Sequence, residues 1–311
     1  MGKYIIKRIL MALPMMLAVS FIAFVLINLI PADPAEVVLR VNEIIPTEEA
    51  IEGMREELGL NKPYLQRYFD WLWDVLHLNL GNSYVNKNRT VAGEITRSLP
   101  ATFELAAVSL FIVIFVSIPV GLLCAVWKDS IFDRVVRIFI FIGTAMPNYW
   151  IGILLIWLFA VKLGVLPTGG NNQEGAIILP AITLSLTYIS TYVRLIRNSI
   201  LENMIENYVF YAKVRGLKDR TILLKHVLKN SLQSSITALG MSVVHLLAGT
   251  VVVENIFSWP GIGRLCITAI FNRDYPIIQA YILMMGTLFI VCNLIVDIIH
   301  HKLDPRLHKV V

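Results

Sequence analysis

The chain has 311 residues, of which 57% are hydrophobic and only 16% are charged. A soluble domain of this length needs more polar surface, so the composition excludes most soluble classes of protein. The formal net charge of +5 does not indicate a nucleic-acid partner, because Lys and Arg gather beside apolar segments rather than in one basic patch.

Six stretches contain no Asp, Glu, Lys or Arg: residues 9–32, 105–127, 138–161, 175–193, 230–253 and 275–296. Each provides about 20 residues, which is enough for a helix to cross about 30 Å of hydrocarbon. The first stretch is too long for the core of a cleaved signal peptide, so we expect it to remain as a membrane anchor. The sequence therefore predicts an all-α membrane protein with six transmembrane helices.

The distribution of positive charge predicts which side of the membrane each loop faces. If the chain starts in the cytoplasm, the internal segments hold most of the 27 Lys and Arg residues, whereas the two short external loops hold only Lys162, Arg264 and Arg273. Short cytoplasmic loops of membrane proteins carry an excess of Lys and Arg. We therefore expect a multi-pass protein of the cell membrane with both termini in the cytoplasm.

The long first external loop, residues 33–104, has helical patterns. Pro46, Thr47 and the two acidic residues that follow predict the start of a helix, and Gly59 predicts its end. A second run, residues 64–78, places apolar residues on one stripe at spacings of three and four. We expect a small cap on the outer face, which is either a folded tether or a direct receiver of a partner or substrate.

The loop at residues 194–229 is too structured to be a flexible tether. Its part at 213–229 carries seven charges, and each charge costs about 2.5 kcal/mol or more at the centre of a membrane helix, so the loop stays in the cytoplasm. Apolar residues recur at helical spacing from Leu201 to Ala212, Gly216 interrupts them, and they resume at Ile222. This pattern predicts helix, glycine turn, helix. It is either a rigid knob that a moving soluble partner pushes or an ordinary amphipathic surface helix.

The segment YVFYAKVRGLKDRTILLKHVLKNSL, which begins at Tyr208, resembles the cytoplasmic signature loop of permease subunits in bacterial ABC importers. The residues that carry the resemblance are Tyr208, Tyr211, Ala212, Gly216, Leu217, His226 and Asn230. Ala212 and Gly216 take the Ala and Gly places of the Glu-Ala-Ala-x-x-x-Gly core. Two positions depart from the general pattern, because Tyr211 replaces the usual Glu and Gln233 replaces a common Pro.

Four further segments resemble the peptide and nickel branch of these permeases in order and spacing. They are ENIFSWPGIGRL from Glu254, NRDYPIIQ from Asn272, NLIVD from Asn293 and DPR from Asp304. Together with the signature loop and the six apolar stretches, they extend the resemblance along nearly the whole chain.

This resemblance implies a type I ABC importer permease fold with an extracytoplasmic cap between the first two transmembrane helices. The implied domains are residues 1–94, with the first helix and the cap, residues 95–303, with five transmembrane helices, and a cytoplasmic tail at 304–311. The implied coupling loop covers about 200–232, and its contact with the ATPase is formed by Tyr211, Ala212, Lys213, Val214, Arg215, Gly216 and Leu217.

The same resemblance implies a heteromeric complex in the bacterial inner membrane. The implied partners are a second permease subunit, two ATPase subunits, an extracytoplasmic substrate-binding protein and membrane lipid, with no nucleic acid. The chain has no Gly-x-x-x-x-Gly-Lys-Ser/Thr loop and no hydrolase pattern, so we expect ATP to bind to the partner subunits and the chain to be no enzyme itself. We expect no cofactor and no metal site, and we interpret His300, His301 and His308 as part of a cationic flank.

The turn that contains Pro260, Gly261 and Gly263 breaks helix geometry after the fifth apolar stretch. Because irregular backbone is costly in hydrocarbon, we expect the turn at the outer interface or lining a cavity. It is either a gate-region loop or a plain reversal between two spans. The charged residues around it, Glu254, Arg264, Arg273 and Asp274, are expected to form ion pairs with each other or with a docking protein.

Two polar residues inside apolar stretches are candidates for the translocation path. They are His245 in the fifth stretch and Asn148, which follows Pro147 in the third. Polar groups inside a membrane are frequently functional. A hydrogen bond to a neighbouring helix accounts for either residue equally well.

The resemblance leaves the substrate open. The run from Glu254 to Gln279 is most similar to the nickel branch, so we expect nickel or a metal chelate (a metallophore) as substrate, with a dipeptide or an oligopeptide as the alternative. An ion-coupled secondary transporter and a membrane enzyme are both disfavoured. The apolar stretches contain no acidic residue, and no convergent group of His, Asp and Glu is evident.

Overall fold

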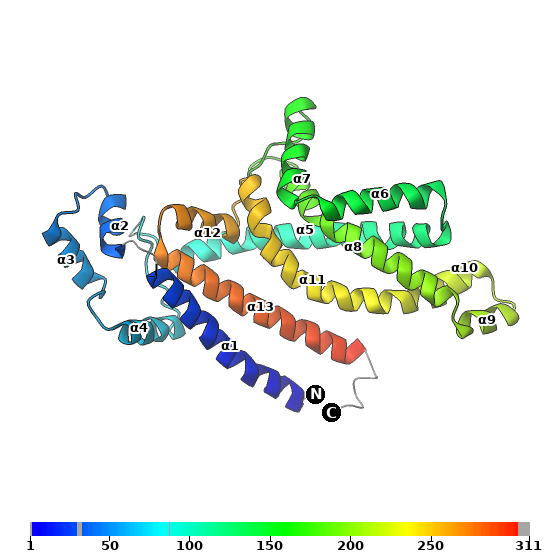
Figure 1. The fold of residues 1–311 in the computed structure, drawn as a ribbon, viewed down its shortest axis with the longest axis horizontal. Coiled ribbons are helices and arrows are strands. Elements are labelled where there is room, and N and C mark those ends of the chain that lie inside the picture. Colours follow the sequence, from blue (N-terminus) through cyan, green and yellow to red (C-terminus); the bar gives the residue numbers. More distant parts are fainter. Residues whose placement is uncertain (1, 30–32, 87, 304–311) are drawn as a thin grey trace. The chain divides into compact units, whose positions relative to one another are not determined.

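The computed structural model describes residues 2–29, 33–86 and 88–303 (Figure 1). The expected tail at 304–311, which includes His308, lies outside these residues. Over the described part, the regular structure is helical, apart from an isolated β-bridge between Asn82 and Thr90. The chain divides into two units, Met1–Ala101 with Pro260–Leu294, and Thr102–Trp259 with Ile295–Val311.

The first unit is built from one long helix at each end of the chain and a set of short helices between them. The helices are α1 (Gly2–Asn28), α2 (Pro34–Val41), α3 (Glu48–Glu57), α4 (Tyr64–Leu76), α12 (Ile262–Phe271) and α13 (Tyr275–Leu303), of which α13 belongs here as far as Leu294. Its main core joins α1, α12, α13 and the start of α5 (Val91–Val126) through Ile27, Val91, Ile95, Ala269, Tyr275, Ile277, Ile278 and Ala280.

Helices α2 and α3 form a small separate core in the cap. The backbone N–H of Ala50 donates to Thr47 Oγ1 at 3.3 Å, which caps the first turn of α3, and Gly59 adopts a φ of +65° just after the helix ends. The predicted start and end of this helix are therefore confirmed. Helix α2 was not predicted, because its eight residues are too few to display a clear periodicity.

The second unit is organised around α8. It contains most of α5, followed by α6 (Ile131–Ala145), α7 (Asn148–Leu155), the π-helical turn η1 (Ile156–Lys162), α8 (Ile178–Met204) and α11 (Leu228–Ile256), with the coupling loop between α8 and α11. Helix α8 packs against α6, α7 and α11 (Figure 1). Helix α6 approaches α8 closely at Gly143, where a Cβ atom would lie 2.3 Å from Ser190 Oγ.

Five helices in the described part are long and apolar enough to cross a membrane: Leu10–Asn28, Val91–Val126, Ile178–Met204, Ala238–Ile256 and Tyr275–Val296. The remaining predicted span, residues 138–161, is not one straight helix. It is a pair, Ile131–Ala145 and Asn148–Lys162, bent by 110°, so the count is six only if this pair is one span. Pro147 causes the break, because it forces Met146 into an extended conformation (ψ 132°). The all-α membrane fold itself is confirmed.

Candidate functional site

The loop between α8 and α11 has the predicted order of helix, glycine turn and helix. It contains α9 (Asn207–Val214), the turn at Gly216, the short α10 (Asp219–Thr221) and the π-helical segment η2 (Ile222–Val227). Gly216 has a φ of +79°, and the N–H of Leu217 donates to the Ala212 carbonyl oxygen at 3.2 Å, which closes the end of α9. The apolar run expected as one helix from Leu201 to Ala212 is instead split, because α8 ends at Met204.

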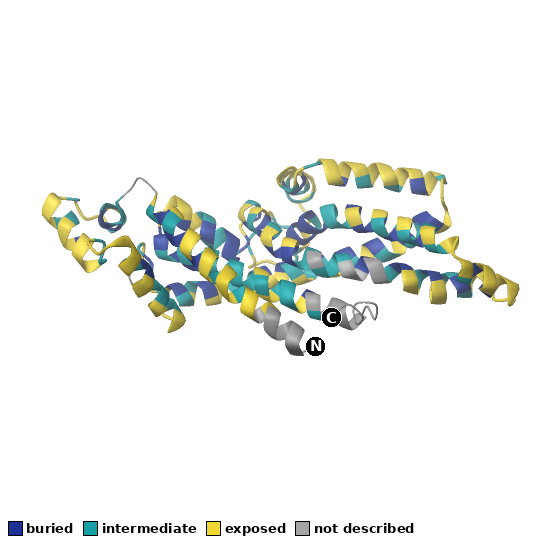
Figure 2. Ribbon diagram, turned by 60° about the horizontal axis from the view of Figure 1, so that its bottom comes forward, coloured by how far each residue is buried: buried dark blue, intermediate teal, exposed yellow. Residues whose placement is uncertain are grey.

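Helix α9 has apolar residues on both of its faces. Val209 and Ala212 are buried and join the core that α8, η2 and the start of α11 share. On the opposite side, Phe210, Tyr211 and Val214 are 65% to 70% exposed. The exposed surface at this end of the second unit is visible in Figure 2. An exposed apolar face of this kind is typical of surfaces on which another protein docks.

The structure places most of the predicted coupling residues on the surface. Tyr211, Lys213, Val214, Arg215, Gly216 and Leu217 are exposed, whereas Ala212 is buried. The Nζ atom of Lys213 lies 3.9 Å from Asp219 Oδ1 across the turn, which is a weak exposed pair. Ala212 therefore has a packing role, and its six neighbours are available for contact.

Side-chain bonds on two sides of α8 join this helix to its neighbours in the second unit. The Arg197 guanidinium on α8 donates two hydrogen bonds to the carboxylate of Asp133 on α6. On the other side, Ser199 and Ser231 each donate through Oγ to the carbonyl oxygen of the other at 3.2 Å, and the Tyr192 hydroxyl donates to Ser242 Oγ at 2.6 Å. These bonds tie α8 to both α6 and α11.

Sequence reasoning did not single out Asp133. A signal was present, because Ser130 and Asp133 have the spacing of a helix cap, and the Asp133 N–H does donate to Ser130 Oγ at 3.2 Å. That pattern indicates the start of α6. It does not indicate the contact of Asp133 with Arg197, which lies 64 positions further along the chain.

The loop around Pro260 and Gly261 begins α12 in the first unit. Gly261 is extended (φ −90°, ψ 176°) and buried, and Gly263 lies in the first turn of α12. The predicted break in helix geometry is present, because α11 ends at Ile256 and α12 begins at Ile262. Neither of these glycines uses a positive φ. Arg273, near the other end of α12, has one instead, at 55°.

Asp274 is buried and holds the segment at Ser83 and Tyr84 against the start of α13. The Ser83 hydroxyl donates to Asp274 Oδ2, and the backbone N–H of Tyr84 donates to Oδ1 at 3.0 Å. These neutral donors differ from the surface ion pairs that the sequence suggested. Glu254, in the second unit, is also buried, and it accepts a hydrogen bond from Thr102 Oγ1 at 2.6 Å.

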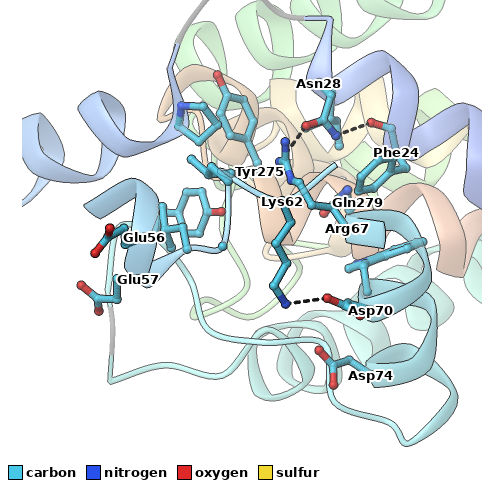
Figure 3. A pocket seen from close by; sticks show the side chains of 17 residues that line it. Phe24, Asn28, Glu56, Glu57, Lys62, Arg67, Asp70, Asp74, Tyr275 and Gln279 are labelled. Carbon is cyan, nitrogen blue, oxygen red and sulfur yellow. Dashed lines mark hydrogen bonds and ion pairs between the residues drawn. The ribbon is translucent and has the colours of Figure 1, made fainter. Parts of the chain in front are cut away.

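A pocket of about 430 Å³ lies between the cap and α13 in the first unit (Figure 3). Two cations border it and both are engaged, because Lys62 Nζ lies 2.7 Å from Asp70 Oδ2 and Arg67 Nη2 donates to Asn28 Oδ1 at 2.8 Å. Burial raises the pKa of the Tyr84 phenol in its wall to about 12, so this hydroxyl stays protonated to a higher pH than a solvated phenol.

The two candidates for the translocation path differ in their surroundings. Asn148, at the start of α7, accepts a hydrogen bond from Thr187 Oγ1 on α8 at 2.6 Å. The bond to a neighbouring helix, which the sequence left open, is therefore present for Asn148. His245 on α11 is exposed on the surface of its unit.

The chain matches two protein-family models along most of its length. The model described as "Binding-protein-dependent transport system inner membrane component" matches residues 117–309, and the N-terminal model of the same kind of membrane component matches residues 1–106. The chain belongs to this permease family. The resemblance to permease subunits of ABC importers is thereby confirmed, as is the type of protein, a multi-pass membrane permease.

Curated relatives of the permease cover its whole length. It is 38% identical over 310 residues to the metal-staphylopine import system permease protein CntB of Staphylococcus aureus, with 99% of each chain covered. It is 36% identical over 317 residues to the oligopeptide transport system permease protein AppB of Bacillus subtilis, again with 99% of each chain covered. The names of these two relatives, a metal-staphylopine permease and an oligopeptide permease, are consistent with the peptide and nickel branch that the sequence motifs indicated.

A solved structure shows the same fold. The permease superposes on a chain of the MetNI methionine ABC transporter in an inward-facing conformation with a TM-score of 0.56, over 68% of this chain and 96% of that one. The sequence identity is 18%, so the likeness concerns the fold alone. It confirms the prediction of a type I importer permease fold.

Proposed function

We propose that this permease forms one half of a translocation pore in the bacterial inner membrane and transmits the motion of separate ATPase subunits to it. The complex would contain a second permease subunit, two ATPase subunits and an extracytoplasmic binding protein, and both termini of this chain would be cytoplasmic. The observation that carries the proposal is α9, a short helix with a buried face toward α8 and an exposed apolar face at the end of the loop.

The coupling mechanism follows from the two faces of α9. Phe210, Tyr211 and Val214 offer an apolar knob for a groove in the ATPase. Val209 and Ala212 transfer the movement of that knob to α8, because packed side chains move together rather than deform. ATP binds and is hydrolysed in the partner subunits. The permease contributes the helix that moves, α9, and the translocation path.

We assign the gate to the outer loop around Pro260, Gly261 and Gly263, together with Glu254, Arg273 and Asp274. The extended backbone at Gly261 and the buried Asp274 support a loop of fixed conformation rather than a slack connection. The exposed Arg273 is available to a docking binding protein. His245 is the better candidate for the translocation path, because the side chain of Asn148 is already engaged by Thr187.

We propose a metal chelate, such as a nickel or other metallophore complex, as the substrate. The support is the likeness of the run from Glu254 to Gln279 to the nickel branch and the 38% identity to a metal-staphylopine permease. A peptide is the second candidate, supported by the 36% identity to an oligopeptide permease. A metal chelate and a small peptide are similar in size and polarity, so one pore plan serves either.

Reconstitution in proteoliposomes tests both parts of this proposal. The permease pair, the ATPase subunits and the cognate binding protein are supplied with ATP and either a radiolabelled nickel chelate or a labelled dipeptide. We expect uptake of the chelate that depends on every component. Uptake of the dipeptide alone would move the substrate to the second candidate, and ATP hydrolysis by the isolated permease would remove the proposed division of labour.

A further inference from the structure

Helix α4 has an apolar face that the described residues of the first unit leave uncovered. Leu65, Phe69 and Leu76 are 62% to 70% exposed, and their spacing of four and seven residues places them on one side of the helix. Trp73, which borders this side, is exposed as well. The opposite side of α4 carries Asp70 and borders the polar pocket of Figure 3.

The contacts of Tyr68 show where α4 lies along α1. The Tyr68 hydroxyl is 2.9 Å from Ser20 Oγ, and its ring meets that of Phe21 edge-on with centroids 5.2 Å apart. Ser20 is eight residues before the end of α1 at Asn28, which corresponds to about 12 Å along the helix axis. Leu10–Asn28 is the part of α1 that is long and apolar enough to cross a membrane, so we place α4 beside the membrane-crossing part of α1 rather than above it.

An apolar groove of about 350 Å³ runs along the junction of α1 and α4. Its walls are Phe21, Phe24, Val25, Asn28, Leu29, Tyr64 and Leu65. Arg67 lies beside this groove rather than in its wall. Its guanidinium donates to Asn28 Oδ1, and the guanidinium carbon is 5.5 Å from the Tyr64 ring centroid and 5.9 Å from that of Phe24. An apolar groove with a cation beside it is the pattern that complements a phospholipid.

We propose that α4 is an interfacial helix and that the junction of α1 and α4 binds one phospholipid. The acyl chain lies against Phe21, Val25 and Leu65, the phosphate meets Arg67, and Phe69, Trp73 and Leu76 face the surrounding lipid. The depth favours lipid over the soluble partners, because a soluble protein does not reach the level of Ser20 in a membrane. The nearby Arg67 favours a phospholipid over an apolar helix of a second permease subunit. The inference is independent of which substrate the permease carries.

Spin labels on the two faces of α4 test its position in the assembled transporter in nanodiscs. Cys124, Cys266 and Cys292 are first replaced by Ala, and uptake by this background is verified. A label at Phe69→Cys is then expected to be relaxed by oxygen, which concentrates in lipid, and to be shielded from a water-soluble nickel chelate. The label at Asp70→Cys, on the other face, is the matched control with the reverse response.

Two results would overturn the interfacial position of α4. One is free access of the aqueous reagent to position 69. The other is shielding that appears only after the binding protein is added, which would assign the face to a protein partner. Leu76→Cys serves as a second site on the same face if the variant at 69 does not assemble.

Native mass spectrometry of the complex, purified with phosphatidylglycerol and phosphatidylethanolamine, tests the bound lipid. Arg67→Gln is expected to retain phospholipid about fivefold more weakly, since one basic side chain near a lipid phosphate contributes about 1 kcal/mol. Arg40→Gln, which removes a cation that pairs with Glu36 on α2, is the control and should retain the wild-type amount. Equal retention by the two variants would overturn the site, and the ratio of the two lipids retained shows whether the headgroup or only the phosphate is recognised.

Discussion

Arg197 on α8 and Asp133 on α6 form a paired, two-point contact in the second unit. The Nε atom of Arg197 lies 2.8 Å from Oδ1 of Asp133, and its Nη2 atom lies 2.8 Å from Oδ2. The side chain of Asp133 is 0% exposed and that of Arg197 is 13% exposed. The backbone N–H of Asp129 donates a further bond to Oδ2 at 3.0 Å, so the contact joins the α5–α6 turn to α8 about two turns before the coupling loop.

We predict that Asp133→Ala destabilises the protein by about 3–5 kcal/mol, because it leaves the Arg197 charge largely buried without its partner. Thermal unfolding of the purified complex measures the loss. Arg137→Gln is the control, since Arg137 is 47% exposed and its closest approach to Asp133 is 3.4 Å. That change should cost at most about 1 kcal/mol. Equal losses of stability for the two variants would show that the buried pair contributes no more than the exposed one.

The pair also tests the proposed path of motion. Asp133→Asn keeps the shape of the side chain but weakens the two bonds to Arg197, so α6 and α8 should move less tightly together. We expect uptake to fall further than ATP hydrolysis, which lowers the number of substrates carried per ATP. An unchanged ratio at reduced stability would restrict the pair to a structural role.

We predict that Gly216→Pro abolishes uptake while the protein still inserts in the membrane. Proline fixes φ near −65°, whereas Gly216 has a φ of +79°, and proline also lacks the N–H that donates to the Lys213 carbonyl oxygen at 2.9 Å. Gly216→Ala should have a milder effect of about 1 kcal/mol, because no atom lies within 4 Å of the added Cβ and only the backbone is strained.

Expression level and ATP-driven uptake distinguish these two variants. Gly53→Ala is the matched control, since Gly53 also has open space around its Cβ but lies within α3 at an ordinary helical φ. Normal uptake by Gly216→Pro would remove the turn from the coupling mechanism.

The exposed face of α9 gives a third prediction. Phe210→Ala should weaken the binding of the ATPase subunits about tenfold or more, because truncating an anchor at an interface costs at least about 1–2 kcal/mol. The stability of the permease itself should hardly change, since Phe210 is exposed. Co-purification at increasing salt and detergent measures the binding. Ile205→Ala, a change at another exposed apolar residue outside α9, should leave the affinity as it is.

Much of the fold could be predicted from the sequence, because a helix that crosses a membrane needs a long apolar stretch with few or no charged residues. The absence of charge located the membrane segments. Gly216 located the turn of the coupling loop, since a glycine that separates two runs of helical periodicity is typical of a helix end followed by a turn. The bend at Pro147 was not predicted, because an apolar stretch without charge does not reveal whether it crosses the membrane straight.

The pairings of the buried charges could not be predicted. Asp133 meets Arg197, and Asp274 meets Ser83, across 64 and 191 positions of sequence. In the local sequence, each acidic residue has the pattern of a helix N-terminus. The distant donor to its carboxylate is brought close only by the tertiary packing. The exposed face of α4 was predicted as part of one apolar stripe with Tyr68, but a single periodicity does not separate a face toward α1 from a face toward lipid.

The contact of Asp274 with the segment at Ser83 and Tyr84 gives the last prediction. Asp274→Ala removes the acceptor for the Ser83 hydroxyl and for the Tyr84 N–H, both in a buried setting, so the first unit should lose about 1–3 kcal/mol of stability. The amide of Tyr84 should then exchange its hydrogen faster, and uptake should fall although the ATPase subunits still bind at α9. Arg273→Gln, a change at the exposed neighbour, should leave the exchange of this amide as it is. If the Tyr84 amide exchanges at the same rate with and without the Asp274 carboxylate, Asp274 does not fix this outer loop, and its place in the proposed gate has to be given up.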